Sequence, residues 1–192
     1  MPRGIKGPKP GQSLWEDKPL ILGSSAIHEA VLRGDIIIDP FDPEQLSPNS
    51  YDFRLGDRCK VYRPGTLDPR IPLDYEEHQI GPEGLLLQPG ELYLVNTYEK
   101  MGSDVYVPII RGRSSTGRLG LFINVTADLI DLGSINEWTL QLSPVLPVRI
   151  FPGMLVGQVT FWEVKGARTL YGGKYKDRLS PVESLSFLDH KQ

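Results

Sequence analysis

The densest group of side chains that could hold an anion lies in residues 111–121, RGRSSTGRLGL. Its arginines supply fixed positive charge, its serines and threonine supply hydroxyl donors, and its glycines leave backbone N–H groups accessible. Together these groups can bind an oligophosphate. The P-loop pattern is absent from this stretch, and serine, glycine and arginine are also common in solvated turns. A phosphate cradle and a plain turn both fit these residues taken alone.

A second group follows in residues 137–142, EWTLQL, where polar and apolar side chains alternate. In an extended strand the two kinds point to opposite faces. The apolar face is expected to pack in a core. The polar face carries Glu137, Thr139 and Gln141, and it either meets solvent or lines a site.

Short strands and turns must position these groups, because 20 glycines and 17 prolines interrupt the chain too often for long helices. One short helix is predicted over residues 24–33, with Ser24 or Ser25 as its cap and Gly34 as its end. Strands are predicted near residues 35–40, 50–56, 85–87, 92–95, 106–110, 119–125, 138–142, 148–151 and 155–161. This spacing favours a closed or two-sheet antiparallel β fold.

Three parts are expected along the chain. Residues 1–19 read as a flexible arm, residues 20–170 as one β domain, and residues 171–192 as a mobile C-terminal lid or tail. A formal net charge of −3 argues against a polymeric nucleic-acid partner. No apolar run approaches a membrane span and the first residues lack a signal peptide, so we expect a cytoplasmic protein.

Cysteine and histidine are too scattered for a zinc site. Cys59 is the single cysteine and is expected to be an inert core residue, while His28, His78 and His190 lie far apart in the sequence. Any metal is instead expected to be a hard ion that arrives with a phosphorylated ligand.

Several segments, in order, resemble the dCTP deaminase family, whose fold is similar to that of the trimeric dUTPases. The matching segments are residues 39–42, 46–56, 87–91, 113–121, 125–127, 130–133, 152–158 and 173–175. The likeness runs from about Leu20 to Ser184. It implies a mainly β, dUTPase-like distorted antiparallel β-barrel or jelly-roll with one short N-terminal helix. It also implies a homotrimer with sites shared between subunits.

The resemblance further implies a deoxynucleoside triphosphate ligand, dCTP or dUTP, with Mg²⁺ bound through the triphosphate and not through the protein. Phosphate-binding positions match Arg113, Ser114 and Ser115, and the arginine near the catalytic carboxylate matches Arg118. Asp131 matches the aspartate associated with the deoxyribose, and the equivalent aspartate in dUTPases orients the attacking water.

The C-terminal segment matches residues that close over the phosphates in that family. Tyr171 and Lys174 occupy such positions, and Arg178 stands where the family has a phosphate-binding glutamine. A basic side chain can still hold a phosphate.

The main departure from the family concerns the general base. The family carries a glutamate ten residues after the aspartate, and that position here is Gln141. A carboxylate can take a proton from the water that attacks C4 of cytosine, whereas a carboxamide cannot. Glu137 lies on the same strand face but roughly 13 Å away, so it is not a simple substitute.

The turn after Asp131 also departs from the family. The family's Asp-Pro-Gly reads Asp131-Leu132-Gly133 here, and Ser134 and Asn136 replace an aromatic residue and a glycine. These changes indicate a reshaped base or sugar pocket.

Three hypotheses follow from these matches and departures. The first is a dCTP deaminase that forms dUTP, in which Gln141 is either native and tolerated or was introduced for glutamate. The second is a dUTPase-like hydrolase that cleaves the triphosphate with a water oriented by Asp131. The third is a member of the family that binds nucleotide without chemistry.

Overall fold

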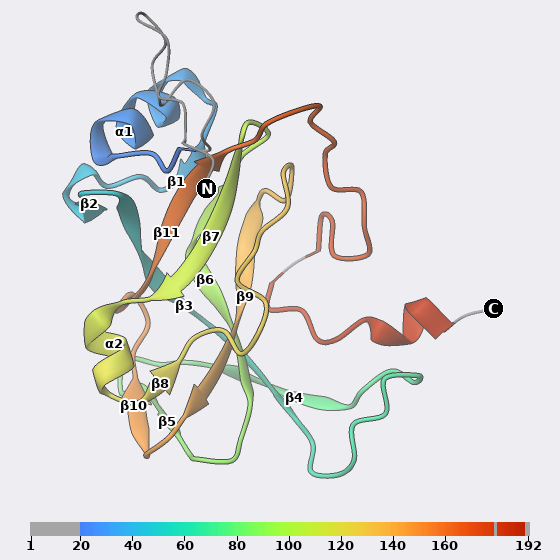
Figure 1. Ribbon diagram of the computed structural model, residues 1–192. Coiled ribbons are helices and arrows are strands. Elements are labelled where there is room, and N and C mark those ends of the chain that lie inside the picture. Colours follow the sequence, from blue (N-terminus) through green and yellow to red (C-terminus); the bar gives the residue numbers. More distant parts are fainter. Residues whose placement is uncertain (1–19, 179, 191–192) are drawn as a thin grey trace, which may run out of the picture.

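The protein is described here by a computed structural model that covers residues 20–178 and 180–190. Strands dominate, and helices are few and short (Figure 1). The helical elements are α1 (Ser24–Arg33), η1 (Pro43–Gln45), α2 (Ser114–Arg118) and η2 (Ser186–His190). The strands are β1 (Ile37–Asp39), β2 (Leu46–Ser47), β3 (Ser50–Tyr62), β4 (Tyr75–Gln79), β5 (Leu85–Leu87), β6 (Tyr93–Gly102), β7 (Tyr106–Gly112), β8 (Leu121–Phe122), β9 (Asn136–Pro144), β10 (Val148–Ile150) and β11 (Leu155–Glu163).

Nine of these strands form one antiparallel sheet that curls into a nearly closed barrel. Its main path runs β7-β11-β3-β6-β9-β8, with β1 added beside β6 and both β2 and β4 added beside β3. The remaining pair, β5 and β10, forms a small second sheet. This arrangement confirms the predicted mainly β, barrel-like fold.

The single predicted N-terminal helix is confirmed as α1. Its buried face carries Ile27 and Ala30, and it ends at Gly34, whose φ of 78° is the left-handed conformation that glycine adopts without strain. The expected serine cap is not formed, because Gly23 occupies the N-cap position and gives no side-chain hydrogen bond. The proposed arm over residues 1–19 lies outside the described residues.

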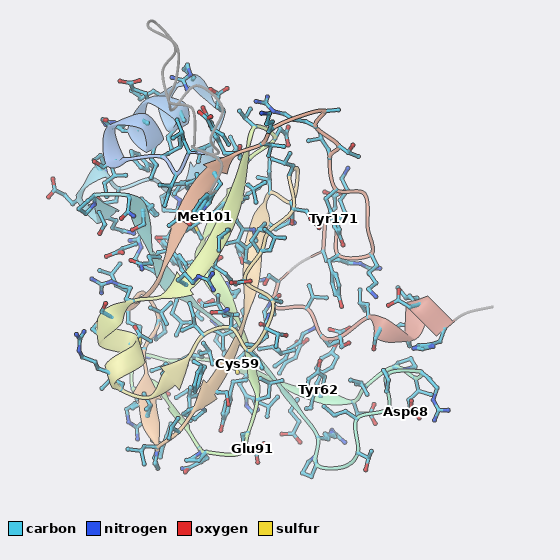
Figure 2. The ribbon with its side chains drawn as sticks, in the orientation of Figure 1. Cys59, Tyr62, Asp68, Glu91, Met101 and Tyr171 are labelled. Atoms are coloured by element: carbon cyan, nitrogen blue, oxygen red, sulfur yellow. The ribbon has the colours of Figure 1, made fainter. Side chains whose placement is uncertain are left out.

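The core lies inside the barrel and takes the apolar face of each strand. In β9 the side chains of Trp138, Leu140 and Leu142 are buried, as the alternation predicts. Cys59 and Met101 also lie in this interior, at 1% and 0% exposure (Figure 2). Burial raises the pKa of the Cys59 thiol to about 12, which fits the prediction of an inert core residue.

After β11 the chain runs back across the barrel and carries no further strand among the described residues up to 190. The backbone N–H of Tyr171 donates to the carbonyl of Leu132 at 2.6 Å, which fixes this segment beside the turn after Asp131. Figure 1 shows the segment on the opposite side of the molecule from α2. In the described part of the chain, no helix has the length and apolar character needed to cross a membrane.

Candidate functional site

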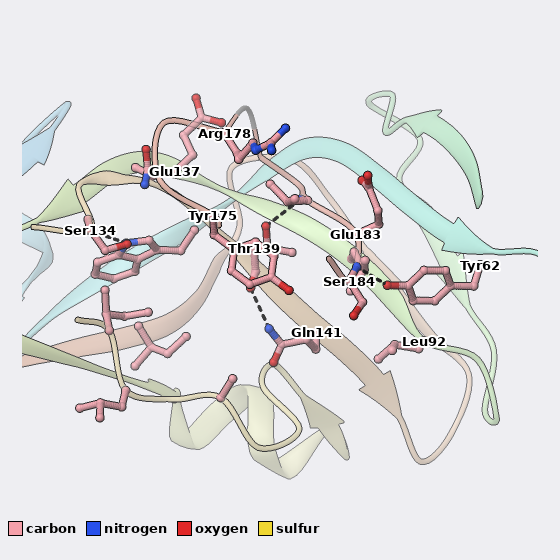
Figure 3. Close-up of a pocket in the computed structure, with 18 residues that line it drawn as sticks. Tyr62, Leu92, Ser134, Glu137, Thr139, Gln141, Tyr175, Arg178, Glu183 and Ser184 are labelled. Carbon is pink, nitrogen blue, oxygen red and sulfur yellow. Dashed lines mark hydrogen bonds between the residues drawn. The ribbon is translucent and has the colours of Figure 1, made fainter. Parts of the chain in front are cut away.

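A cavity of about 410 Å³ lies between the polar face of β9 and the C-terminal segment (Figure 3). Its floor carries Glu137, Thr139 and Gln141, the three side chains that alternation places on one face. The volume falls within the range usual for small-molecule sites. The polar face of β9 therefore lines a cavity and does not simply meet bulk solvent.

Gln141 is held in this cavity by its own strand and by the residue that follows β8. Its amide Nε2 donates to the carbonyl of Thr139 at 3.0 Å, and its backbone N–H donates to the carbonyl of Ile123 at 2.9 Å. The amide oxygen remains as an acceptor that can hold a water or a base edge. No atom of this side chain can accept a proton at neutral pH.

Glu137 supplies a carboxylate to the same cavity, and its oxygen Oε2 is already engaged. It pairs with the guanidinium of Arg58 and accepts a hydrogen bond from Asn96 Nδ2 at 3.0 Å. Asn96 in turn accepts from the backbone N–H of Arg58 at 2.9 Å. The network fixes the position of the Glu137 carboxylate against β3 and β6.

The opposite wall comes from the C-terminal segment and from the end of β3. Tyr175, Arg178 and Glu183 line it together with Tyr62. Figure 3 shows Tyr175 and Arg178 on the side of the cavity facing β9. Of these wall residues only Arg178 was predicted as a site residue. Tyr175 falls in the matching segment 173–175 but was not singled out as a site residue. Tyr62 and Glu183 lie in no matching segment that was read as a site, so the sequence carries no signal for them.

The predicted phosphate cradle forms the short helix α2 and does not line this cavity. Ser114, Ser115 and Arg118 are exposed to solvent. Arg113 lies just before the helix and points toward β3 of the same chain. Its Nε lies 2.9 Å from Oδ2 of Asp52 on that strand. The cradle thus presents two hydroxyls and the exposed side chain of Arg118 outward.

The Asp131 turn lies at the edge of the cavity. Ile130 and Ser134 on either side of the turn line the cavity, whereas Asp131 itself is exposed and is not among its lining residues. Gly133 has a φ of 81°, and a Cβ at this position would come within 3.3 Å of the Tyr171 backbone nitrogen. A glycine is therefore needed for the turn to meet the C-terminal segment.

Lys174 also belongs to the C-terminal segment but does not line the cavity. Its ammonium forms an ion pair with Asp189, and that hydrogen bond raises the pKa of Lys174. The predicted site residues therefore fall into three groups. Gln141 and Arg178 share the cavity, Asp131, Tyr171 and Lys174 lie beside it in the turn and the C-terminal segment, and the α2 residues lie elsewhere.

Comparison with known proteins identifies the family of the chain. A sequence model of a family described as dCTP deaminase-like matches residues 21–164. A protein of Clostridium botulinum (strain Alaska E43 / Type E3) named "dCTP deaminase, dUMP-forming" is 45% identical over 159 residues, which is 82% of this chain and 92% of that protein. A dCTP deaminase of Rhodopirellula baltica is 47% identical over 151 residues, which is 79% of this chain and 76% of that protein.

A solved structure supports the fold. The crystal structure of 2'-deoxycytidine 5'-triphosphate deaminase from Agrobacterium tumefaciens superposes with a TM-score of 0.61 at 24% identity. The match covers 75% of this chain and about half, 48%, of that one. The resemblance read from the motifs is therefore confirmed, and the chain belongs to the dCTP deaminase family of hydrolases.

Proposed function

We propose that the protein binds Mg²⁺·dCTP with its nucleoside half in the cavity beside Gln141 and converts it to a deoxyuridine nucleotide. The placement of Gln141 carries this proposal, since the residue that the motif resemblance matches to the family's base lines a cavity of about 410 Å³. The names of the relatives, which specify dCTP, support the choice of substrate. Mg²⁺ enters as part of the substrate, and we assign it no protein ligand.

Deamination adds water to C4 of cytosine and releases ammonia. The oxygen of Gln141 can accept a hydrogen bond from that water and orient it. The proton must leave by another route, because the carboxamide cannot take it. Without a general base the rate falls on the order of 10² to 10⁴, so we expect slow deamination.

The triphosphate is assigned to the α2 cradle of a second copy of the chain. On one chain the cradle and the cavity are separate, so a nucleotide in the cavity needs Ser114, Ser115 and Arg118 from a neighbour. Apolar side chains around α2 and β8 that are more than half exposed would be covered by that neighbour; they are Leu119, Phe122, Val125, Val145 and Leu146. The expected assembly is a homotrimer, and a monomer by light scattering at micromolar concentration would contradict it.

The C-terminal segment completes the proposed site. Tyr171 and Lys174 would close over the triphosphate, with Arg178 at the rim of the cavity as a further phosphate contact. Closure of this kind excludes water from the nucleotide and orders the reacting groups.

A second reaction, cleavage of the triphosphate to a monophosphate and diphosphate, is favoured by two observations. The exposed carboxylate of Asp131 lies in the turn beside the cavity and could orient a water. The relatives named dUMP-forming give a product from which diphosphate has been removed. This reaction does not need a base at position 141. It can therefore proceed in this chain even where deamination is slow.

The test follows ammonia and diphosphate separately when purified protein is incubated with Mg²⁺ and either dCTP or dUTP. Ammonia from dCTP supports deamination, and diphosphate together with ammonia places dUMP as the product. Diphosphate without ammonia favours hydrolysis alone. If neither product forms while calorimetry detects nucleotide binding, both enzymatic proposals fail and the protein is a nucleotide-binding member of the family.

A further inference from the structure

Residues 180–185, which we call the strap, are docked on strands of their own chain. Thr139 on β9 anchors the start of the strap, because its Oγ1 lies 2.9 Å from Ser180 Oγ and accepts from the backbone N–H of Val182 at 2.9 Å. Tyr62 at the end of β3 anchors the middle, accepting from the backbone N–H of Ser184 at 2.8 Å. The strap ends on Leu185, which is only 5% exposed.

One ion pair joins the strap to β3 between these anchors. Lys60 Nζ lies 2.7 Å from Glu183 Oε2, and the two side chains are 14% and 23% exposed. The ammonium also lies 4.2 Å from the centre of the Tyr75 ring. A second carboxylate, that of Glu77, lies 3.5 Å from the same ammonium but is 68% exposed. The pair with Glu183 is thus the more shielded of the two.

Both members of this pair keep their charge. Burial opposes ionisation of Glu183. The hydrogen bonds from Lys60 and from its own backbone N–H, together with the positive charges of Lys60 and Arg178, outweigh burial and hold the pKa of the carboxyl below its usual value. Burial likewise disfavours the Lys60 ammonium, while its hydrogen bonds to Glu183 and Tyr75 raise the pKa above the usual value. Removing the Glu183 charge would leave the partly buried ammonium of Lys60 with only the more exposed carboxylate of Glu77, and removing the Lys60 charge would leave Glu183 without its ion-pair partner.

The strap in turn holds the cavity wall. The backbone N–H of Leu185 donates to the hydroxyl of Tyr175 at 3.1 Å, so the strap fixes the ring that lines the cavity opposite β9. Glu183 and Ser184 line the same cavity directly (Figure 3). In Figure 2, Tyr62 lies where the end of β3 meets the C-terminal segment.

We propose that Lys60 and Glu183 are a positioning pair, which keeps the strap docked on its own chain and so forms the Tyr175 wall before nucleotide binds. A wall that is already ordered spares the nucleotide the entropy cost of ordering it. The proposal rests on the proposed function for its ligand, dCTP, but the docking of the strap can be measured without any ligand.

The variants are Glu183→Gln, Lys60→Glu and the exchanged pair Lys60→Glu/Glu183→Lys. Glu77→Gln is the matched control, because it removes the exposed carboxylate from the same ammonium. Hydrogen exchange of peptides covering residues 180–186 reports docking in the free protein. Calorimetry with Mg²⁺·dCTP reports affinity, and steady-state assays separate KM from kcat.

Glu183→Gln is expected to speed exchange in residues 180–186 and to weaken dCTP binding about tenfold, the effect of a wall formed in roughly a tenth of the molecules. KM should rise by a similar factor with kcat nearly unchanged, because the reacting groups are untouched. The exchanged pair should restore both exchange and affinity, and Glu77→Gln should match the parent protein.

Unchanged exchange in Glu183→Gln would overturn the proposal, as would faster exchange with unaltered affinity or an exchanged pair that restores nothing. If the parent protein binds no dCTP, the proposed function fails instead. The exchange measurement then still decides whether the pair docks the strap.

Discussion

Substituting Gln141→Glu tests how the cavity could perform deamination. In the parent protein the amide Nε2 donates to the Thr139 carbonyl at 3.0 Å. A carboxylate oxygen at that position would face the carbonyl as a second acceptor, so the hydrogen bond is lost and the charged form is disfavoured. We expect the pKa of the new carboxyl to lie above that of a solvated glutamate, closer to the operating pH where a general base works best.

The magnitude follows from these two effects. Gaining a general base should raise kcat for ammonia release on the order of 10² to 10⁴, which corresponds to about 2.7 to 5.4 kcal/mol of activation free energy. Losing the hydrogen bond to Thr139 should lower the free energy of unfolding by about 1 kcal/mol. Affinity for dCTP should change little, because the phosphate cradle and the cavity walls stay as they are.

The assay is steady-state ammonia release from dCTP between pH 5 and pH 9, with diphosphate followed in parallel. The variant should gain a rising limb with pH, since the base must be deprotonated to act, and the parent should lack that limb. Gln88→Glu serves as the control, because it makes the same charge change at an exposed position outside the cavity. If Gln141→Glu binds dCTP normally yet releases ammonia no faster, the position does not carry the base and the reasoning fails.

Three further predictions concern the cradle and the fold. Ser115→Ala and Arg118→Ala should each weaken triphosphate binding by about 1 to 3 kcal/mol, the range for hydrogen bonds to charged groups, and unchanged calorimetric affinity in both would exclude the cradle. Glu99 is fully buried and accepts from the Arg54 backbone N–H at 2.8 Å and from Arg54 Nε at 2.7 Å. Glu99→Gln should therefore cost about 3 kcal/mol in urea unfolding, and a loss below about 1 kcal/mol would contradict this. The pKa of Glu183 is lowered in the folded state, so the stability that this carboxylate contributes is present above its unfolded pKa near 4.5 and is lost as pH falls through its folded pKa. Glu183→Gln should therefore reduce the loss of unfolding free energy between these two pKa values. An unchanged dependence of the unfolding free energy on pH would show that the carboxyl is not coupled to folding.

The sequence predicts the fold well where side chains alternate or where a turn residue marks an end. Helix α1 ends at Gly34 as predicted, and β9 shows the predicted alternation. Strand β4 is missed because its sequence, YEEHQ, has no apolar alternation and its residues are mostly exposed. It forms because β3 continues past Gly56 to Tyr62 and offers an edge for pairing.

Gly56 also explains why the predicted strand over residues 50–56 is too short. A Cβ at this position would lie 2.3 Å from the Asn96 side chain, so glycine here permits close approach of β6 and does not end the strand. The register between β3 and β6 shifts between Leu55 and Cys59, which marks a bulge in the pairing. From the sequence alone, a glycine that marks a bulge within a strand cannot be distinguished from a glycine that marks a turn.

The candidate site was only partly predictable for a similar reason. Gln141 and its face of β9 follow from local alternation, which the sequence records directly. The opposing wall depends on contacts between residues far apart in the chain, such as Tyr62 with Ser184 and Lys60 with Glu183. No spacing rule links such pairs, because they meet only after the barrel has formed.

Binding and chemistry can be separated at this site because they depend on different atoms. A carboxamide has nearly the shape of a carboxylate and still accepts a hydrogen bond, so Gln141 can keep the contacts that hold a base or a water. What it lacks is a proton-accepting carboxylate oxygen. The nearest carboxylate on the same strand face, that of Glu137, is held by Arg58 and Asn96 through Oε2 and lies four residues along the strand. Affinity for dCTP should therefore resemble that of a chain with glutamate at this position, while the deamination rate should not. A parent protein that releases ammonia as fast as the Gln141→Glu variant would show that the base does not lie at position 141.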